Sequence, residues 1–327
     1  MENNNLLVSS TPHIRSNETI QSVMRDVVIA LLPAAIMGVI LFGIKAAILI
    51  ITSVISCMFF EALYQKLAKK PVTISDFSAV ITGLLLAMNI PASAPIWVPI
   101  VGSFFAIVIV KQLFGGLGQN FMNPALGARA FLLASYPTAM SGTAFNATGF
   151  GNIGVIDATS SATPLAQIAE GSVNSISQTD IINALVGNIG GCIGETCAIA
   201  LILGGIYLII RKVISWRIPV TYILTTFICT ILISALSGEI RFPVYELFTG
   251  GLMLGAFFMA TDYASSPVTP KGQLIMGIGC GFLTALIRTL GGYPEGVSYS
   301  ILLMNLCVPL IDRYTSPKKF GEVKKNA

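Results

Sequence analysis

The sequence predicts an all-α integral membrane protein with about ten transmembrane helices, arranged as two five-helix inverted repeats with a long extracytoplasmic loop between them. Composition, the spacing of apolar stretches and features shared by the two halves indicate this class. Of 327 residues, 54% are hydrophobic and 10% are charged, against about 45–50% and 25% in soluble domains. The net charge is only +4, and the basic residues lie between apolar runs. Nucleic acid is therefore not an expected partner.

The apolar stretches set the order of the predicted helices, because about 20 apolar residues cross a bilayer. They lie at residues 27–43, 46–64, 77–88, 96–113 and 124–136, and then at 194–210, 220–236, 248–260, 274–290 and 297–311. The chain is thus divided into a cytoplasmic leader at 1–24, a first repeat at 25–136, the long loop at 137–193, a second repeat at 194–314 and a cytoplasmic tail at 315–327. The leader lacks the features of a cleaved signal, so the first stretch is expected to stay as an anchor.

Orientation follows from the basic residues, because Lys and Arg accumulate on the cytoplasmic side of membrane proteins. With the amino terminus inside, the cytoplasmic ends hold Arg15, Arg25, Lys66, Lys69, Lys70, Lys111, Arg211, Lys212, Arg217, Lys271, Arg313, Lys318 and Lys319. The other ends hold only Lys45, Arg241 and Arg288. We therefore expect a multi-pass protein with both termini cytoplasmic and residues 137–193 outside.

Two features recur in the halves and indicate the repeat. The third stretch contains Thr-Gly-Leu-Leu-Leu-Ala from Thr82, and the eighth contains Thr-Gly-Gly-Leu-Met-Leu-Gly from Thr249. The stretch that follows ends at a double glycine in each half, at Gly115 and at Gly291. Five helices per half would make the repeats inverted, with sites where short helices break at the repeat interface. Coincidence in a Leu- and Gly-rich chain is the alternative.

Two aspartates next to short apolar stretches are candidates for an ion path. Asp76 adjoins the third stretch and Asp262 follows the eighth. Irregular backbone at membrane depth is tolerated only where it is buried in protein or lines water, and a carboxylate there could bind a hard cation, which prefers oxygen ligands. Each aspartate could instead cap a helix end. Glu61 and Glu195, in or beside apolar stretches, are further candidates for the same role.

A glycine-rich segment at residues 115–125 leads into the fifth stretch and reads Gly-Gly-Leu-Gly-Gln-Asn-Phe-Met-Asn-Pro-Ala. Glycines ahead of a helix let backbone N–H groups approach an anion or an aromatic ring, although a tight turn explains them equally well. Arg129, within the fifth stretch, needs an anionic or carbonyl partner, or else its long side chain reaches the inner interface.

The long polar interval contains residues 157–163, Asp-Ala-Thr-Ser-Ser-Ala-Thr. Pro164 favours an extended Thr163, whose hydroxyl could then be presented to a second protein. A flexible Ser/Thr/Ala loop is the plain alternative. The segment resembles the acceptor motif of bacterial flavin transferases, in which an Asp, a small hydroxyl residue and Gly-Ala-Thr or Gly-Ala-Ser receive FMN as a phosphoester on the last hydroxyl. Ser161 stands where glycine is usual.

With this motif, the glycine-rich segment and the ten-helix layout, residues 24–314 resemble the D subunits of the Rnf ion pumps and the related B subunits of sodium-pumping NADH:quinone reductases. The resemblance implies a bacterial inner-membrane subunit of an ion-translocating ferredoxin:NAD oxidoreductase, with FMN held covalently on Thr163 as an electron relay. The implied cofactor-binding residues are Asp157, Ser160, Ser161, Ala162 and Thr163, with Asn120, Asn123 and Arg129 as candidates for flavin or subunit contacts.

The resemblance also implies partners. Nothing in the chain resembles a nucleotide fold or ferredoxin cysteine spacing, so iron–sulfur subunits and subunits that react with NAD and ferredoxin would lie elsewhere in the complex. A flavin transferase would attach the FMN, and a related family member holds riboflavin non-covalently, so a second flavin could bind here. Two other functions fit the residues: an inverted-repeat secondary transporter without redox chemistry, and a passive scaffold subunit that tolerates loss of Thr163.

Overall fold

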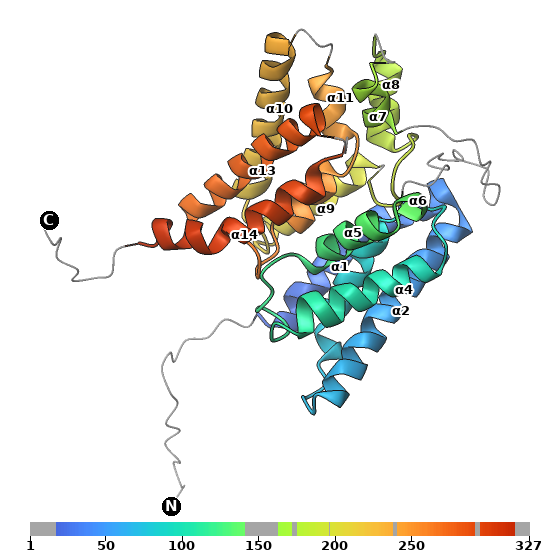
Figure 1. Cartoon of the computed structure of the whole chain (residues 1–327), viewed down its shortest axis with the longest axis vertical. Helices are drawn as coiled ribbons and strands as arrows, with labels where there is room; N and C mark the ends of the chain where they lie inside the picture. The colour runs from blue at the N-terminus through green and yellow to red at the C-terminus, as the bar shows by residue number, and fades with distance from the viewer. Residues whose placement is uncertain are drawn as a thin grey trace, which may run out of the picture.

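The computed structural model describes residues 18–140, 163–171, 175–195, 197–237, 241–291 and 295–317. Within these ranges the regular secondary structure is helical and no strand occurs, which confirms the all-α prediction for this part of the chain. Figure 1 shows the first-half helices, coloured blue to green, packed together on one side of the molecule and the last helices, orange to red, on the other.

The first half begins with two long helices, α1 (Ile20–Phe42) and α2 (Ile44–Leu67). α1 begins before the predicted apolar stretch because the Thr19 side chain accepts a hydrogen bond from the Ser22 backbone N–H and caps the helix. Gly43 joins the two helices at a φ of 77°, which glycine adopts without a Cβ clash. The shorter elements that follow are η1 (Ile74–Asp76), α3 (Ser78–Met88), α4 (Trp97–Phe104), its π-helical continuation η2 (Phe105–Gln112) and α5 (Pro124–Ser135).

The second half has three long helices and a series of short ones. The long helices are α10 (Arg217–Ser237), α13 (Pro270–Leu290) and α14 (Val297–Thr315). The shorter elements are α9 (Ala198–Ile210), α11 (Pro243–Phe248), α12 (Leu252–Leu254) and the π-helix η3 (Gly255–Met259).

Every predicted apolar stretch overlaps a helix of the structure. Among the described residues, α1, α2, α10 and α13 are long and apolar enough to cross a membrane, while α3, α9 and the continuous α4 and η2 are shorter apolar helices. The chain therefore has several helices suited to a membrane, and the arrangement of ten spanning helices as an inverted repeat stays a prediction.

The predicted loop at residues 137–193 contains helices of its own. They are α6 (Pro137–Met140), α7 (Pro164–Ala169) and α8 (Gln178–Val186). α8 begins with a capping box, in which the Ser177 hydroxyl and the Asp180 carboxylate each accept a hydrogen bond from the other residue's backbone N–H. This region is therefore partly ordered by local helix-capping interactions.

α3 is too short to cross a membrane alone. Its 11 residues extend about 16 Å, roughly half of a 30 Å hydrocarbon core. Beyond its end, the Gly194 N–H donates to the Met88 carbonyl at 2.9 Å and the Ile193 N–H donates to the Ile90 carbonyl at 3.2 Å. The chain around Gly194 thus satisfies backbone groups at the end of α3, and this irregular backbone is buried in protein, as membrane depth requires.

The two halves meet along two helix pairs, α1 with α9 and α5 with α14. Asn123 adds a direct bond between the halves, because its side-chain N–H donates to the Met259 carbonyl at 3.2 Å. The α1–α9 contact is so close that a Cβ added at Gly204 would lie 2.2 Å from the Ala30 carbonyl oxygen. Glycine at this position therefore permits the approach of the two backbones.

We predict that Gly204→Ala lowers stability by about 1–3 kcal/mol, the usual cost of overpacking, because the new methyl group meets the α1 backbone. The measurement is the apparent melting temperature of the purified protein. Gly279→Ala is the matched control: its Cβ would meet only the flexible end of Met304, so it should be close to neutral. Equal effects of the two substitutions would contradict the packing argument.

Candidate functional site

The first buried polar cluster surrounds Arg129 of α5. The Arg129 guanidinium donates hydrogen bonds to the side-chain oxygen of Asn89 and to one carboxylate oxygen each of Glu195 and Glu295. Asn89 ends α3, Glu195 shortly precedes α9 and Glu295 shortly precedes α14. Four segments that are distant in the sequence therefore converge on one guanidinium, and we refer to these four residues as the Arg129 cluster.

The Arg129 cluster contains one positive charge and two carboxylates. Arg129 and Glu195 are buried, with 6% and 2% of their surfaces exposed. The Oε2 atom of Glu195 is buried and has no hydrogen-bond partner among the described residues. Potential ligand atoms of Cys192, Glu195 and Glu295 lie within 4.8 Å of one another, a grouping that could hold a metal ion. Arg129 already pairs with both carboxylates.

Thr163 lies at a small pocket next to the Arg129 cluster. The pocket is lined by Thr163, Pro164, Leu165, Gly190, Gly191, Glu195, Gly250 and Glu295. Its volume of about 10 Å³ is close to the minimum for a single water molecule. The half-buried Thr163 hydroxyl caps α7 by accepting a hydrogen bond from the Ala166 N–H at 3.3 Å, and the backbone of Thr163 is extended (ψ 152°), as the following proline predicts.

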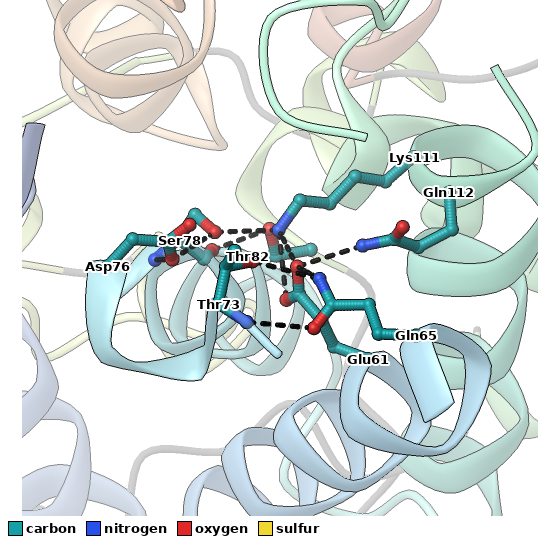
Figure 2. Close-up of polar contacts among 8 residues, drawn as sticks. All are labelled: Glu61, Gln65, Thr73, Asp76, Ser78, Thr82, Lys111 and Gln112. Carbon is teal, nitrogen blue, oxygen red and sulfur yellow. Dashed lines mark hydrogen bonds and ion pairs between the residues drawn. The ribbon is translucent and has the colours of Figure 1, made fainter. Parts of the chain in front are cut away.

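The second cluster surrounds Lys111 of η2 and is shown in Figure 2. The Lys111 ammonium donates to both carboxylate oxygens of Glu61 at 2.9 Å and to the Ser78 hydroxyl at 2.7 Å. Gln112 donates to Glu61 at 2.9 Å. Lys111 and Glu61 are each 1% exposed. We refer to Glu61, Ser78, Lys111 and Gln112 as the Lys111 cluster.

The two predicted ion-path aspartates both adjoin the Lys111 cluster. One Asp76 carboxylate oxygen accepts from the Ser78 N–H at 2.9 Å and from the Ser78 hydroxyl at 2.6 Å, so Asp76 caps the start of α3. Asp262 accepts from the Ser265 hydroxyl at 3.0 Å and lines, together with Lys111, a cavity of about 90 Å³. The capping geometry expected as an alternative is therefore present at Asp76.

The two asparagines of the glycine-rich segment line that same cavity. Asn123 has a structural role, because its side-chain oxygen accepts from the N–H groups of Ala125 and Leu126 and caps α5. The Asn120 side-chain oxygen is buried and has no hydrogen-bond partner in the described part of the chain. Of the predicted flavin contacts, the structure brings Arg129 toward Thr163 and brings Asn120 and Asn123 toward Asp262.

Asp157, Ser160, Ser161 and Ala162 lie outside the described residues. The alternative in which Arg129 reaches the inner interface is wrong, because its charge is paired inside the protein. Lys111, expected among the residues at the cytoplasmic ends of the helices, is buried inside the protein. The sequence signal for a buried Lys111 was its position inside an apolar stretch. No comparable signal marked Glu295 or Asn89 as partners of Arg129.

Almost the whole chain matches a known protein family. Residues 7–321 match the NQR2, RnfD, RnfE family, and the chain belongs to that family. It is 53% identical to the D subunit of the Na(+)-translocating ferredoxin:NAD(+) oxidoreductase complex of Acetobacterium woodii, over 99% of this chain and 98% of the relative. It is 45% identical to the D subunit of the proton-translocating ferredoxin:NAD(+) oxidoreductase complex of Clostridium ljungdahlii, over 98% of each. The D subunit of an ion-translocating oxidoreductase complex of Aliivibrio salmonicida is 35% identical over 97% of this chain and 99% of the relative. The family predicted from the sequence is thereby confirmed.

We predict that Arg129→Gln destabilises the protein by about 3–5 kcal/mol, because it leaves buried carboxylates without their counter-charge. The apparent melting temperature of the purified protein measures the effect.

Arg211→Gln is the control for loss of a paired arginine. Arg211 contacts Asp26 at 3.0 Å, but its side chain is 54% exposed. Hydrogen bonds to Asp26 raise the pKa of Arg211. Asp26 is buried but also accepts a hydrogen bond from the Tyr207 hydroxyl at 3.3 Å, and Arg211 is largely in water, so the melting temperature should fall less than in the Arg129 variant. An Arg129 variant as stable as the Arg211 variant would show that the buried carboxylates do not need the guanidinium.

Proposed function

We propose that this chain is the D-type membrane subunit of a complex that couples electron transfer between ferredoxin and NAD to translocation of Na+ or H+, with an FMN attached covalently to Thr163 as an electron relay. The single observation that carries the redox role is the Thr163 hydroxyl, which ends an acceptor-like motif and lies beside the buried Arg129 cluster. The names of the relatives support the ion-coupled reaction. The chain would supply part of this oxidoreductase and no complete activity alone.

The residues around Thr163 fit an attachment point. The hydroxyl is half-buried and makes one capping bond, to the Ala166 N–H, so a flavin transferase could reach it and the same N–H could then donate to a phosphoester oxygen. Arg129 pairs with Glu195 and Glu295, which line the pocket beside the hydroxyl, and offsets one of their two negative charges. Asp157, Ser160, Ser161 and Ala162 would form the segment that the transferase grips.

When bound, FMN supplies the electron-transfer chemistry, while the protein sets its position and electrostatic surroundings. The pocket at Thr163, of about 10 Å³, is far below the roughly 300–1,000 Å³ of pockets for such ligands. The ring would therefore lie outside this pocket, where iron–sulfur and other partner subunits could cover it. Thr163 is then a tether and not a nucleophile during turnover.

A second flavin, such as riboflavin bound non-covalently, would need a different place. The cavity lined by Asn120 and Asn123 measures about 90 Å³, also below the range of about 300–1,000 Å³. Asn120 and Asn123 therefore fit contacts within the chain better than flavin contacts. A subunit interface is the more suitable location for a second flavin. The proposed setting is a bacterial inner membrane with both termini cytoplasmic and the Thr163 loop, residues 137–193, extracytoplasmic.

In this proposal Asp76 and Asp262 belong to the ion path. The redox state of the flavin would alter the affinity of that path for a cation, because coupling requires different ion affinities in the two redox states. Asp76 lines a cavity of about 620 Å³ on one side of the Lys111 cluster, and Asp262 lines the cavity of about 90 Å³ on the other.

A secondary transporter without redox chemistry would have the same broken helices, and a passive scaffold subunit would have the same partners. Neither needs a modified hydroxyl. The family membership and the names of its relatives favour the redox complex, and covalent flavin on Thr163 is the property that distinguishes it from both alternatives.

We expect the denatured protein, co-produced with a flavin transferase, to give a flavin-fluorescent band in a gel. Thr163→Ala should abolish the band because it removes the acceptor oxygen. Thr163→Ser is the matched control, since it retains a hydroxyl and should remain fluorescent. A dark wild-type band in the presence of an active transferase would refute the attachment.

We also expect Asp76→Asn combined with Asp262→Asn to reduce ion transport per electron transferred, because the variant removes both path carboxylates. Ion uptake and ferredoxin:NAD electron flux should be measured together in vesicles that contain the whole complex. Glu170→Gln, an exposed carboxylate beyond α7, is the control. Unchanged transport and flux in the double variant would rule out this path.

A further inference from the structure

The Lys111 cluster lies between two cavities. Glu61, Gln112 and Asp76 line the larger cavity of about 620 Å³, which is open to the surface. Lys111 and Ser78 line the smaller cavity of about 90 Å³. The hydrogen bonds from the Lys111 ammonium to Glu61 and Ser78 (Figure 2) therefore join residues that line the two cavities.

The ammonium occupies a set of oxygen ligands. Two carboxylate oxygens of Glu61 at 2.9 Å and the Ser78 hydroxyl oxygen at 2.7 Å surround it, one for each of its three N–H donors. Hard metal cations prefer the same kind of ligand, carboxylate and neutral oxygen. The one carboxylate of the group, Glu61, balances a single positive charge. A metal cation could therefore stay there only if the Lys111 ammonium moved away.

The smaller cavity has residues that could receive a displaced ammonium or a passing cation. Asp262 and Asn120 line it, and the buried Asn120 side-chain oxygen has no hydrogen-bond partner in the described ranges. Lysine carries its charge on a flexible four-carbon stem. The charged groups that face Lys111 are thus Glu61 directly, Asp76 through Ser78, and Asp262 across the cavity.

Lys111 and Asp262 both lie in or shortly after irregular helical segments. Lys111 lies in the π-helix η2, where the Gly116 N–H donates to the Lys111 carbonyl at 3.0 Å. Asp262 follows the π-helix η3, where the Ala260 N–H donates to the Gly255 carbonyl at 2.8 Å. π-Helical turns are rare and occur frequently at functional sites, so this position in two helices is consistent with a working site instead of a plain packing contact.

We propose that the Glu61 carboxylate and the Ser78 hydroxyl form a binding site for a small monovalent cation, and that the Lys111 ammonium is a built-in competitor for that site. A cation from the larger cavity binds when Lys111 turns toward Asp262, and it is displaced when Lys111 returns. This inference extends the ion path of the proposed function and does not depend on flavin attachment at Thr163.

The test is the binding of radioactive Na+ to the purified whole complex by equilibrium dialysis, with choline chloride maintaining ionic strength. Lys111→Met removes the competitor and keeps the length of the side chain, so it should bind about one additional Na+ per copy of this chain relative to wild type. Comparison with wild type subtracts sites elsewhere in the complex. Glu61→Gln combined with Lys111→Met should return to the wild-type number, and Lys111→Arg, which keeps the charge, should match it.

An assembled Lys111→Met complex with the wild-type number of Na+ ions would overturn the proposal, as would an additional Na+ that persists in the double variant. If Glu61 takes up a proton in place of Na+, the Lys111→Met complex will bind the wild-type number of Na+ ions. If Lys111→Met fails to assemble in choline buffer, Na+ should restore assembly by replacing the missing charge, and equal failure in both salts overturns the proposal. A negative result here leaves flavin fluorescence unaffected, so the two proposals fail separately.

Discussion

The positions at which the helices of this chain are interrupted depend on buried positive charges. An ionised side chain inside a membrane protein needs a partner within the protein, and three basic residues meet this need by drawing separate segments together. Lys111 holds Glu61 of α2 and Ser78 of α3. Arg129 holds the end of α3 and the residues before α9 and α14. Arg288 of α13 donates to the carbonyl oxygens of Glu246 at 2.7 Å and Glu295 at 3.2 Å. The short helices stay in place because their ends are bound to these charges.

These same pairings separate two kinds of chemistry. The Arg129 cluster lies beside a hydroxyl that suits a covalent redox group, and its positive charge is held fixed between two carboxylates. The Lys111 cluster adjoins open space on both sides, and its positive charge is carried on a flexible stem. A fixed charge suits the steady environment of an electron carrier, whereas a movable charge suits exchange with ions. In the function that we propose, one chain thereby offers a place for each half of an ion-coupled redox reaction.

The sequence predicted the helices better than their contacts. Apolar stretches determine where helices form, and all of them coincide with helices of the structure. Arg129 was expected to need an acidic or carbonyl partner, but Glu195 and Glu295 lie 66 and 166 residues away, and no local pattern identifies them. The count of basic residues at the helix ends gave Lys111 no partner, whereas the structure pairs it inside the protein with Glu61, 50 residues earlier. The family could be predicted because a linear motif carries it; the clusters could not, because they exist only after distant segments meet.

The shortness of α3 has a geometric consequence. Its first residue, Ser78, accepts a hydrogen bond from Lys111, and beyond its last residue Asn89 accepts one from Arg129. One helix of 11 residues therefore joins both clusters as a rod of about 16 Å. The length of α3 thus sets the distance between its hydrogen bonds to the two clusters.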